Sequence, residues 1–271
     1  MNIGFIGTGN MGGAILKGFK AAHQEVPCYA YRRDAEKLAV ICRQTGAVPC
    51  GSIGEVTACS DILFLGVKPV GFPDILPEVA SALHDSAEGA GTEKVIVSMA
   101  AGISLDFIRG YLGEGTKLVR IMPNTPAMIG LGMTSVSRSE GVTDDDMAGV
   151  LTVLESLGKT EEVPEELIHC VIGVSGSSPA YTYMYIEALM KAAVRHGMTE
   201  QQARVFAAQS VLGAASMVLS EEDSPEQLRI NVCSPGGTTI EAVDSLMEDG
   251  FMDIVEKAFD AAAAKSEAMT K

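Results

Sequence analysis

The feature that most constrains the fold is a glycine-rich turn near the start of the chain. Gly7-Thr8-Gly9-Asn10-Met11-Gly12 directly follows the apolar run Ile3–Ile6 and opens a helical pattern. In such a strand–turn–helix unit, the first glycine permits the tight turn and the second lets the backbone approach a pyrophosphate. The third lets helix and strand pack closely. A chance match is the alternative in a chain with 29 glycines. The position directly after an apolar strand nevertheless predicts a dinucleotide-binding site.

Short apolar runs alternate with helical patterns over residues 1–163. This alternation predicts an α/β domain with a parallel, doubly wound sheet that helices cover on both faces. Strands are expected at Ile3–Ile6, Cys28–Tyr31, Asp61–Val67, Val95–Met99, Leu118–Met122 and Met133–Ser137. Helices are expected at Met11–Ala22, Ala35–Gln44, Phe72–Leu83, Leu105–Tyr111 and Thr143–Leu157.

The strand signal disappears from about Pro164, which predicts a second, all-helical domain over residues 164–271. Two of its helices, Tyr181–His196 and Val205–Leu219, are apolar around almost their whole circumference. A helix of that kind must be buried on most sides. Because a small helical domain offers little interior, we expect these helices to lie in an interface between subunits.

Composition and charge exclude several classes of function. With 20 basic and 35 acidic residues the net charge is −15, which disfavours binding to nucleic acid or to an anionic membrane surface. The longest charge-free helical stretch, Val205–Ser220, is expected to be too short to span a membrane. The N-terminus has no basic segment of the kind that begins a signal peptide.

The six cysteines form no C-x-x-C pair, and none of the four histidines lies within ligand spacing of a cysteine. Reduced thiols in a cytoplasmic protein without a metal site are therefore expected. The run Asp144-Asp145-Asp146 has the composition of a metal cluster. It is better explained as the start of a helix, where carboxylates complement the helix dipole.

The end of the second expected strand should report on the adenosine ribose of a bound dinucleotide. It reads Tyr31-Arg32-Arg33-Asp34, where an NAD site usually has a carboxylate on the ribose 2′-hydroxyl. Arg32 and Arg33 instead match a 2′-phosphate, since each guanidinium offers forked donors to its oxygens. We therefore expect NADPH to be preferred and NADH to remain possible. Asp34 is expected to cap the next helix rather than to face the site.

Three further segments follow expected strands at the same edge, where ligands of open parallel sheets bind. They are Lys68-Pro69, Ser98–Gly102 and Met122–Pro126. Each could be an ordinary turn, but their convergence on one edge indicates a role in lining a cofactor site. In the helical half, Gly176–Tyr181 and Ser234–Thr239 each open a helix. Their free backbone N–H groups match a carboxylate ligand, and a plain helix cap explains them equally well.

Together these segments resemble the pyrroline-5-carboxylate reductase family over essentially the whole chain. The matching motifs are FIGTGNMGGAI, DILFLGVKP, VSMAAGI, VRIMPNTPA, GSSPAY followed by YIEAL, and SPGGTTIEAV. Ser178 stands where the family's G-S-G-P-A-Y has its second glycine. The resemblance implies a Rossmann domain followed by a helical domain that interlocks between the subunits of a homodimer, with higher assembly of dimers. It also implies an NAD(P)H-dependent oxidoreductase that acts on a CH–NH group. The substrate would be 1-pyrroline-5-carboxylate and the product L-proline, in the last step of proline biosynthesis.

The resemblance also implies roles for particular residues. Backbone N–H groups of the SPGGTT motif would hold the substrate carboxylate, and the Thr239 hydroxyl would hydrogen-bond the ring nitrogen as the catalytic residue. Ile53 stands where the family often has an asparagine that touches the adenosine ribose. The expected substrate-binding residues are Ser234, Gly236, Gly237, Thr238 and Thr239. With the two arginines included, the expected cofactor-binding residues are Ile6, Gly7, Thr8, Gly9, Asn10, Met11, Gly12, Arg32, Arg33, Val67, Lys68, Pro69, Ser98, Met99, Ala100 and Asn124.

Two other interpretations remain open. A different imine or hydroxyacid reductase of the same architecture is disfavoured by the SPGGTT motif and by the absence of any basic residue between Gly173 and Lys191. A protonated imine accepts hydride without a strong base, so catalysis would depend on positioning and charge complementarity. A non-catalytic NADP-binding regulator is disfavoured because Gly176–Tyr181 and Gly236–Thr239 are both present.

Overall fold

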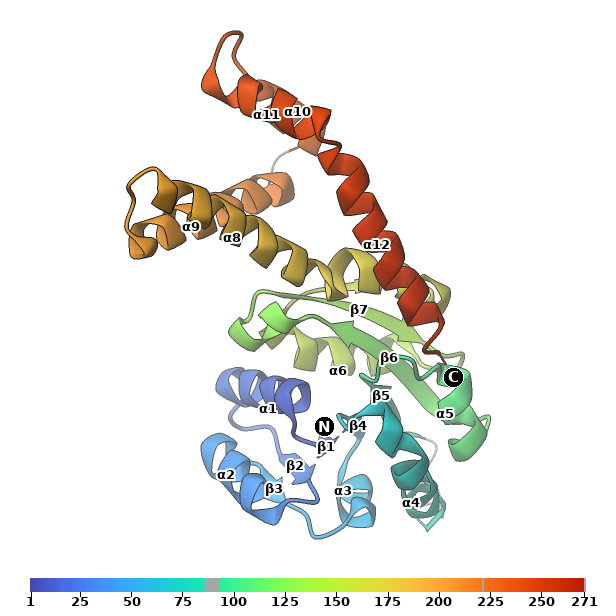
Figure 1. Ribbon diagram of the computed structural model, residues 1–271. Coiled ribbons are helices and arrows are strands. Elements are labelled where there is room, and N and C mark those ends of the chain that lie inside the picture. Colours follow the sequence, from blue (N-terminus) through green and yellow to red (C-terminus); the bar gives the residue numbers. More distant parts are fainter. Residues whose placement is uncertain (86–92, 221, 271) are drawn as a thin grey trace. The chain divides into compact units, whose positions relative to one another are not determined.

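The computed structural model describes residues 1–85, 93–220 and 222–270. The chain forms two compact units, of which the first comprises Met1–Gly176 and Ala262–Lys271 and the second comprises Ser177–Ala261. In Figure 1 the first unit contains the sheet and the second consists of helices.

The first unit extends past the boundary expected between residues 163 and 164. Glu165 explains part of the difference, because its Oε1 accepts hydrogen bonds from Arg120 Nη1 at 2.7 Å and from the Leu105 amide at 2.9 Å. At the C-terminus, Ser266 Oγ lies 2.8 Å from His169 Nδ1. The segment after residue 163 and the last residues of the chain are therefore held by polar contacts within the first unit, and composition alone does not show these contacts.

The first unit is built on an eight-stranded sheet with the order β3-β2-β1-β4-β5-β6-β7-β8. Its strands are β1 (Ile3–Ile6), β2 (Cys28–Tyr31), β3 (Val48–Pro49), β4 (Ile62–Leu65), β5 (Val95–Ser98), β6 (Lys117–Pro123), β7 (Gly132–Arg138) and β8 (Gly158–Glu162). The first six strands pair in parallel, as predicted for five of them, and the two-residue strand β3 was not predicted.

Strand β7 departs from the predicted parallel arrangement, and β8 was not predicted. Strand β7 is antiparallel to β6, and β8 is parallel to β7. Residues 124–131, which connect β6 to β7, are fewer than the roughly dozen residues that a parallel crossover requires. A connection this short returns the chain in the opposite direction.

Helices cover both faces of the sheet, which confirms the predicted doubly wound architecture. Helices α1, α2 and α6 pack on one face, and α3, α4 and α5 pack on the other. Their bounds are α1 (Asn10–Ala22), α2 (Ala35–Thr45), α3 (Ile53–Cys59), α4 (Phe72–Asp85), α5 (Leu105–Leu112) and α6 (Asp144–Leu154). Shorter helical segments are η1 (Pro69–Gly71), η3 (Thr125–Ile129), η4 (Glu155–Leu157), η5 (Glu165–Leu167), α7 (Ile168–Val171) and the π-helical turn η6 (Ile172–Gly176).

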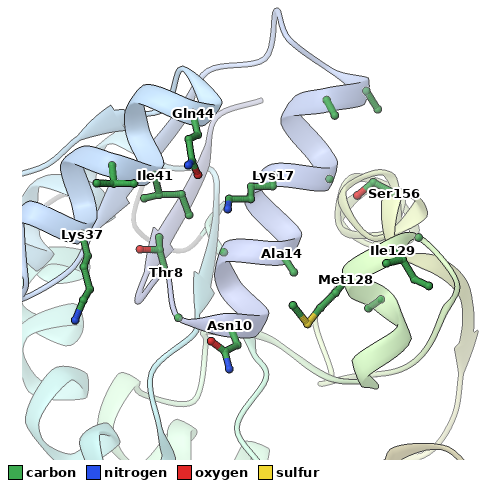
Figure 2. Close-up of a pocket in the computed structure, with 18 of the residues that line it drawn as sticks. Thr8, Asn10, Ala14, Lys17, Lys37, Ile41, Gln44, Met128, Ile129 and Ser156 are labelled. Atoms are coloured by element: carbon green, nitrogen blue, oxygen red, sulfur yellow. The ribbon is translucent and has the colours of Figure 1, made fainter. Parts of the chain in front are cut away.

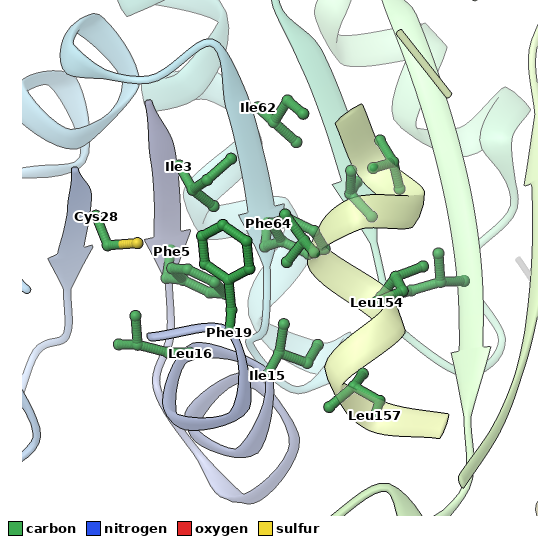
Figure 3. Packing of buried hydrophobic residues seen from close by; sticks show 14 of the residues in the cluster. Ile3, Phe5, Ile15, Leu16, Phe19, Cys28, Ile62, Phe64, Leu154 and Leu157 are labelled. Carbon is green, nitrogen blue, oxygen red and sulfur yellow. The ribbon is translucent and has the colours of Figure 1, made fainter. Parts of the chain in front are cut away.

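Strands β1, β4 and β5 are buried along their whole length, so successive side chains enter different cores. In β4, Ile62 and Phe64 face the core formed with α1 and α6, whereas Leu63 and Leu65 face the core formed with α3 and α4. Phe64 stacks on Phe5 of β1 with ring centroids 5.2 Å apart. Figure 3 shows this pair enclosed by side chains of α1 and of the segment that ends in Leu157. The core thus fixes β1, β4 and α1 as one rigid group.

The second unit is helical, as predicted. It contains α8 (Ser178–Arg195), α9 (Glu200–Ser220), α10 (Pro225–Asn231), α11 (Thr238–Glu248) and the beginning of α12 (Phe251–Glu267). Large apolar side chains are exposed along α8 and α9, among them Met184 at 70% and Phe206 at 63%. Their exposure leaves broad apolar surfaces without a partner within the described part of the chain.

Helix α9 corrects one expectation about length. The charge-free stretch is part of a 21-residue helix that, by length and composition alone, could cross a membrane, and it is the one such helix among the described residues. This criterion is also met by helices of soluble proteins, so α9 does not indicate a membrane protein.

Candidate active site

Loops of the first unit meet at the carboxyl edge of the parallel strands. The register places Tyr31, Ile6, Leu65 and Ser98 in one row across β2, β1, β4 and β5. The chain order of the strands reverses between β1 and β4, which is where ligands of open α/β sheets bind. The predicted cofactor residues at the ends of these strands are therefore brought to one edge.

The glycine-rich turn has the geometry that a pyrophosphate site requires. Gly7 has φ +91°, a conformation that side chains disfavour. A Cβ atom on Gly12 would lie 2.4 Å from the Gly7 carbonyl oxygen, so helix and strand are in backbone contact there. A Cβ atom on Gly9 would meet no atom within 4 Å, so space for a ligand is open at that position.

Free hydrogen-bond donors surround this opening. Helix α1 begins after Gly9 with no side-chain cap and with no acidic residue in its first turn. Its first N–H groups thus remain available to an anion, which the helix dipole also favours. Thr8 is only 3% exposed, and its hydroxyl has no hydrogen-bond partner among the described residues. These groups fit the pyrophosphate of a dinucleotide.

A cavity of about 500 Å³ lies at the ends of β1, β2 and β4. Arg32 is held toward the glycine-rich turn, since its Nη1 donates to the Thr8 carbonyl oxygen at 2.9 Å. The cavity is lined by Ile6, Gly7, Tyr31, Arg32, Arg33, Asp34, Ile53, Val67, Lys68, Val70, Gly71, Asp74, Ile75 and Glu78. Predicted cofactor residues from three strand ends thus line one cavity.

Asp34 caps α2, as predicted, and accepts a hydrogen bond from the Lys37 amide at 3.0 Å. Hydrogen bonds from the Lys37 backbone and side chain lower the pKa of Asp34, so this carboxylate is ionised at neutral pH. Asp74 and Glu78 also line this cavity, although they were not predicted as site residues. They belong to α4, and only the sheet topology shows that the first turns of this helix border the end of β2.

A second cavity of about 990 Å³ runs beside α1 (Figure 2). Thr8 and Asn10 lie at one end of it, side chains of α2 form one wall, and Met128 and Ile129 of η3 form the other. The glycine-rich turn therefore borders both cavities. Because Arg33, Val67 and Lys68 line only the smaller of the two, the smaller cavity matches the predicted adenosine end of the site.

Three further predicted cofactor residues of the first unit differ in their burial and in their hydrogen bonds. Ser98 and Ala100 are 1% and 2% exposed, and the Ser98 hydroxyl accepts the Ala100 amide at 3.4 Å. The Asn124 side chain donates to the Ser175 carbonyl oxygen at 3.2 Å and accepts the Met133 amide at 3.0 Å. The side chains of Ser98 and Asn124 are thus already hydrogen-bonded to other groups of the protein.

The acidic run at α6 has the structural role expected for it. Thr143 and Asp146 form a reciprocal capping box, and Asp144 pairs with Arg138 at 2.7 Å. Within the described ranges, no three or more His, Cys, Asp or Glu side chains are grouped so as to hold a metal ion.

In the second unit, the SPGGTT motif forms the start of α11. Gly236 has φ +69°, and the Gly237 amide donates to the Ser234 carbonyl oxygen at 3.0 Å, which closes a tight turn. Helix α11 then begins with no side-chain cap, and Thr238 and Thr239 are exposed. Neither hydroxyl serves as the plain helix cap that the sequence also allowed. The first N–H groups of α11 remain available to a carboxylate.

Two family models match the chain. One, described as pyrroline-5-carboxylate reductase dimerisation, matches residues 165–269, and the other, described as NADP oxidoreductase, coenzyme F420-dependent, matches residues 2–102. The pyrroline-5-carboxylate reductase of Escherichia coli (strain K12) is 45% identical over 99% of this chain and 98% of its own length.

Solved structures agree with this match. A pyrroline-5-carboxylate reductase from Coxiella burnetii superposes with a TM-score of 0.92 at 32% identity, covering 100% of this chain and 98% of that one. A Plasmodium falciparum pyrroline carboxylate reductase with NADP bound gives a TM-score of 0.85 at 28% identity, with the same coverage. The predicted resemblance and fold class are confirmed, and the chain belongs to the pyrroline-5-carboxylate reductase family.

Proposed function

We propose that the chain catalyses the reaction of its family, in which hydride passes from NADPH to the C=N bond of 1-pyrroline-5-carboxylate and gives L-proline. The observation that carries the proposal is the start of α11, where two glycines precede an uncapped helix and an exposed threonine follows. A small cyclic imine with a carboxylate needs donors of this kind. The full-length identity to curated reductases of this name supports the same assignment.

The first unit would hold the cofactor, which supplies the hydride. Backbone N–H groups at Gly9–Gly12 would bind its pyrophosphate, and Val67–Pro69 and Met99 would line its path along the sheet edge. Arg32 and Arg33 would bind the 2′-phosphate, which makes NADPH the preferred cofactor. Arg32 is already fixed by its hydrogen bond to the Thr8 carbonyl oxygen, so little side-chain freedom would be lost on binding.

The second unit would hold the substrate. Backbone N–H groups of Gly236, Gly237 and Thr238 would bind the carboxylate, with Ser234 closing the turn. The Thr239 hydroxyl would hydrogen-bond the ring nitrogen and help to retain the proton that makes the adjacent carbon electrophilic. Because the imine is activated by that proton, catalysis would rest on orientation and charge complementarity rather than on a strong base.

The proposed molecule is a homodimer whose helical regions interlock, with higher assembly of dimers, in the cytoplasm. The exposed apolar faces of α8 and α9 support this assembly, because patches of that kind mark protein interfaces. The match to a family dimerisation model over residues 165–269 supports it as well.

Two glycine variants separate packing from cofactor binding. Gly12→Ala should lower the melting temperature, because its Cβ atom would collide with the Gly7 carbonyl oxygen. Gly9→Ala should leave the melting temperature unchanged, since its Cβ atom meets nothing within 4 Å. It should still weaken NADPH binding at least tenfold, about 1.4 kcal/mol, by blocking the approach of the pyrophosphate. Calorimetry and thermal melting measure both effects, and unimpaired NADPH binding by Gly9→Ala would contradict the assigned site.

Arg33→Ala tests the assignment of the 2′-phosphate. Because a charge-assisted contact contributes roughly 1.5–3 kcal/mol, NADPH binding should weaken by about 10- to 150-fold. NADH lacks the phosphate, so its affinity should change little. Equal losses for both cofactors would show that Arg33 does not bind the 2′-phosphate.

Thr239→Val keeps the shape of the side chain and removes its hydroxyl. Turnover should fall by about 10- to 100-fold, taking the lost hydrogen bond as roughly 1.4–2.7 kcal/mol in the transition state. NADPH affinity should not change. A structural role alone predicts a lower melting temperature with normal turnover, and a normal kcat would rule out the catalytic role.

Association should be obligate because α8 and α9 expose large apolar surfaces. Light scattering at micromolar concentration should show a dimer or a larger assembly. A folded and active monomer under these conditions would overturn the proposed interface.

A further inference from the structure

Arg33 lies within ion-pair distance of a carboxylate of the chain itself. Its Nη2 lies 3.9 Å from Asp74 Oδ2, in the first turn of α4, and 3.6 Å from the position that a Cβ atom on Gly71 would occupy. The Arg33 side chain therefore lies against the segment that follows β4. Both charged side chains are largely solvent-exposed, at 74% for Arg33 and 72% for Asp74. Such a pair can exchange partners when another anion arrives.

The charges that line the smaller cavity balance one another. Three are cationic and three are anionic: Arg32, Arg33 and Lys68 against Asp34, Asp74 and Glu78. Two of these groups have other fixed partners, since Asp34 pairs with Lys37 at 3.0 Å and Arg32 donates to the Thr8 carbonyl oxygen. Of the other four groups, Arg33 and Asp74 form an ion pair with each other, and a phosphate that binds Arg33 would have to separate them.

We propose that Asp74 is a specificity-determining residue, which reduces the preference for NADPH over NADH by competing with the cofactor's 2′-phosphate for Arg33. This inference rests on the proposed function, in which the cavity takes the adenosine ribose. A 2′-phosphate carries about two negative charges. Asp74 therefore competes with the phosphate for Arg33 and also repels the phosphate directly. A 2′-hydroxyl carries no charge and meets neither effect. Asp74 thus lowers the affinity for one cofactor selectively.

The test measures ligand binding and does not depend on turnover. Calorimetry would compare 2′,5′-ADP, which carries the 2′-phosphate, with 5′-AMP, which lacks it, in low salt. Exposed ion pairs of this kind change an equilibrium by a factor of roughly two to five. Asp74→Asn should therefore tighten 2′,5′-ADP by about that factor and leave 5′-AMP unchanged. The gain should shrink in high salt because exposed charges are screened.

Glu78→Gln is the matched control. It removes one carboxylate from the same cavity, but none of the ion pairs between described residues joins Glu78 to Arg33. Its effect on 2′,5′-ADP should be smaller than that of Asp74→Asn. In an Arg33→Ala background, Asp74→Asn should have a smaller effect on 2′,5′-ADP, because only the direct repulsion between Asp74 and the phosphate is left to remove.

Three outcomes would overturn the inference. Asp74→Asn could weaken 2′,5′-ADP, which would mean that Asp74 orients Arg33 for the phosphate. It could shift both ligands equally or neither, which would mean that Asp74 does not discriminate between them. Its effect could also persist undiminished without Arg33. If the unmodified chain binds neither ligand, the proposed cofactor site fails together with this inference. If the unmodified chain binds both ligands and Asp74→Asn changes neither affinity, this inference fails and the proposed cofactor site stands.

Discussion

The backbone contact between the turn after β1, the start of α1 and the end of β4 is the constraint on which the rest depends. The Gly7 carbonyl oxygen lies 2.4 Å from the positions that Cβ atoms on Gly12 and on Gly66 would occupy. Only glycine at both positions lets the helix and the two strands approach so closely. The same approach aligns β1 with β4 at the point where the strand order reverses, and the Phe5–Phe64 stack buries the junction from one side. The edge at which ligands of such sheets bind is therefore a consequence of backbone packing.

The two proposed anion sites belong to different units, and each is the uncapped N-terminus of a helix. Both α1 and α11 begin next to glycine with no side-chain cap, so their first N–H groups face outward without a partner side chain. This arrangement matters in a chain whose net charge is −15, because the overall field repels anionic ligands. Backbone donors and helix dipoles act over the first turn only, and they bring no side-chain entropy cost. Two of the cations near the cofactor site, Arg32 and Arg33, can then be used for discrimination between cofactors rather than for general attraction.

Much of this arrangement could be predicted from sequence because it depends on patterns within short segments of the chain. Buried parallel strands are short apolar runs, and the glycine spacing identifies the turn. What was missed lacks such a pattern. Strand β3 has only two residues, too few to form a recognisable pattern. Strand β8 is an edge strand with the sequence GKTEE, and its charged residues leave no apolar run that would predict a strand. The direction of β7 depends on the length of the preceding loop. Asp74 and the engaged side chain of Asn124 depend on which elements the topology makes neighbours, and no single segment encodes that relation.

The most direct test of the account mixes the purified chain with NADPH and 1-pyrroline-5-carboxylate and follows both NADPH absorbance and the formation of L-proline. The account predicts that NADPH is consumed only when the imine is present, with one proline formed for each NADPH oxidised. A reductase of another specificity would leave this imine unchanged while acting on a different imine or, with NADP, on a hydroxyacid. A regulator without catalytic activity would bind NADPH and consume none. Either result, from a chain shown to be folded and to bind NADPH, would contradict the account.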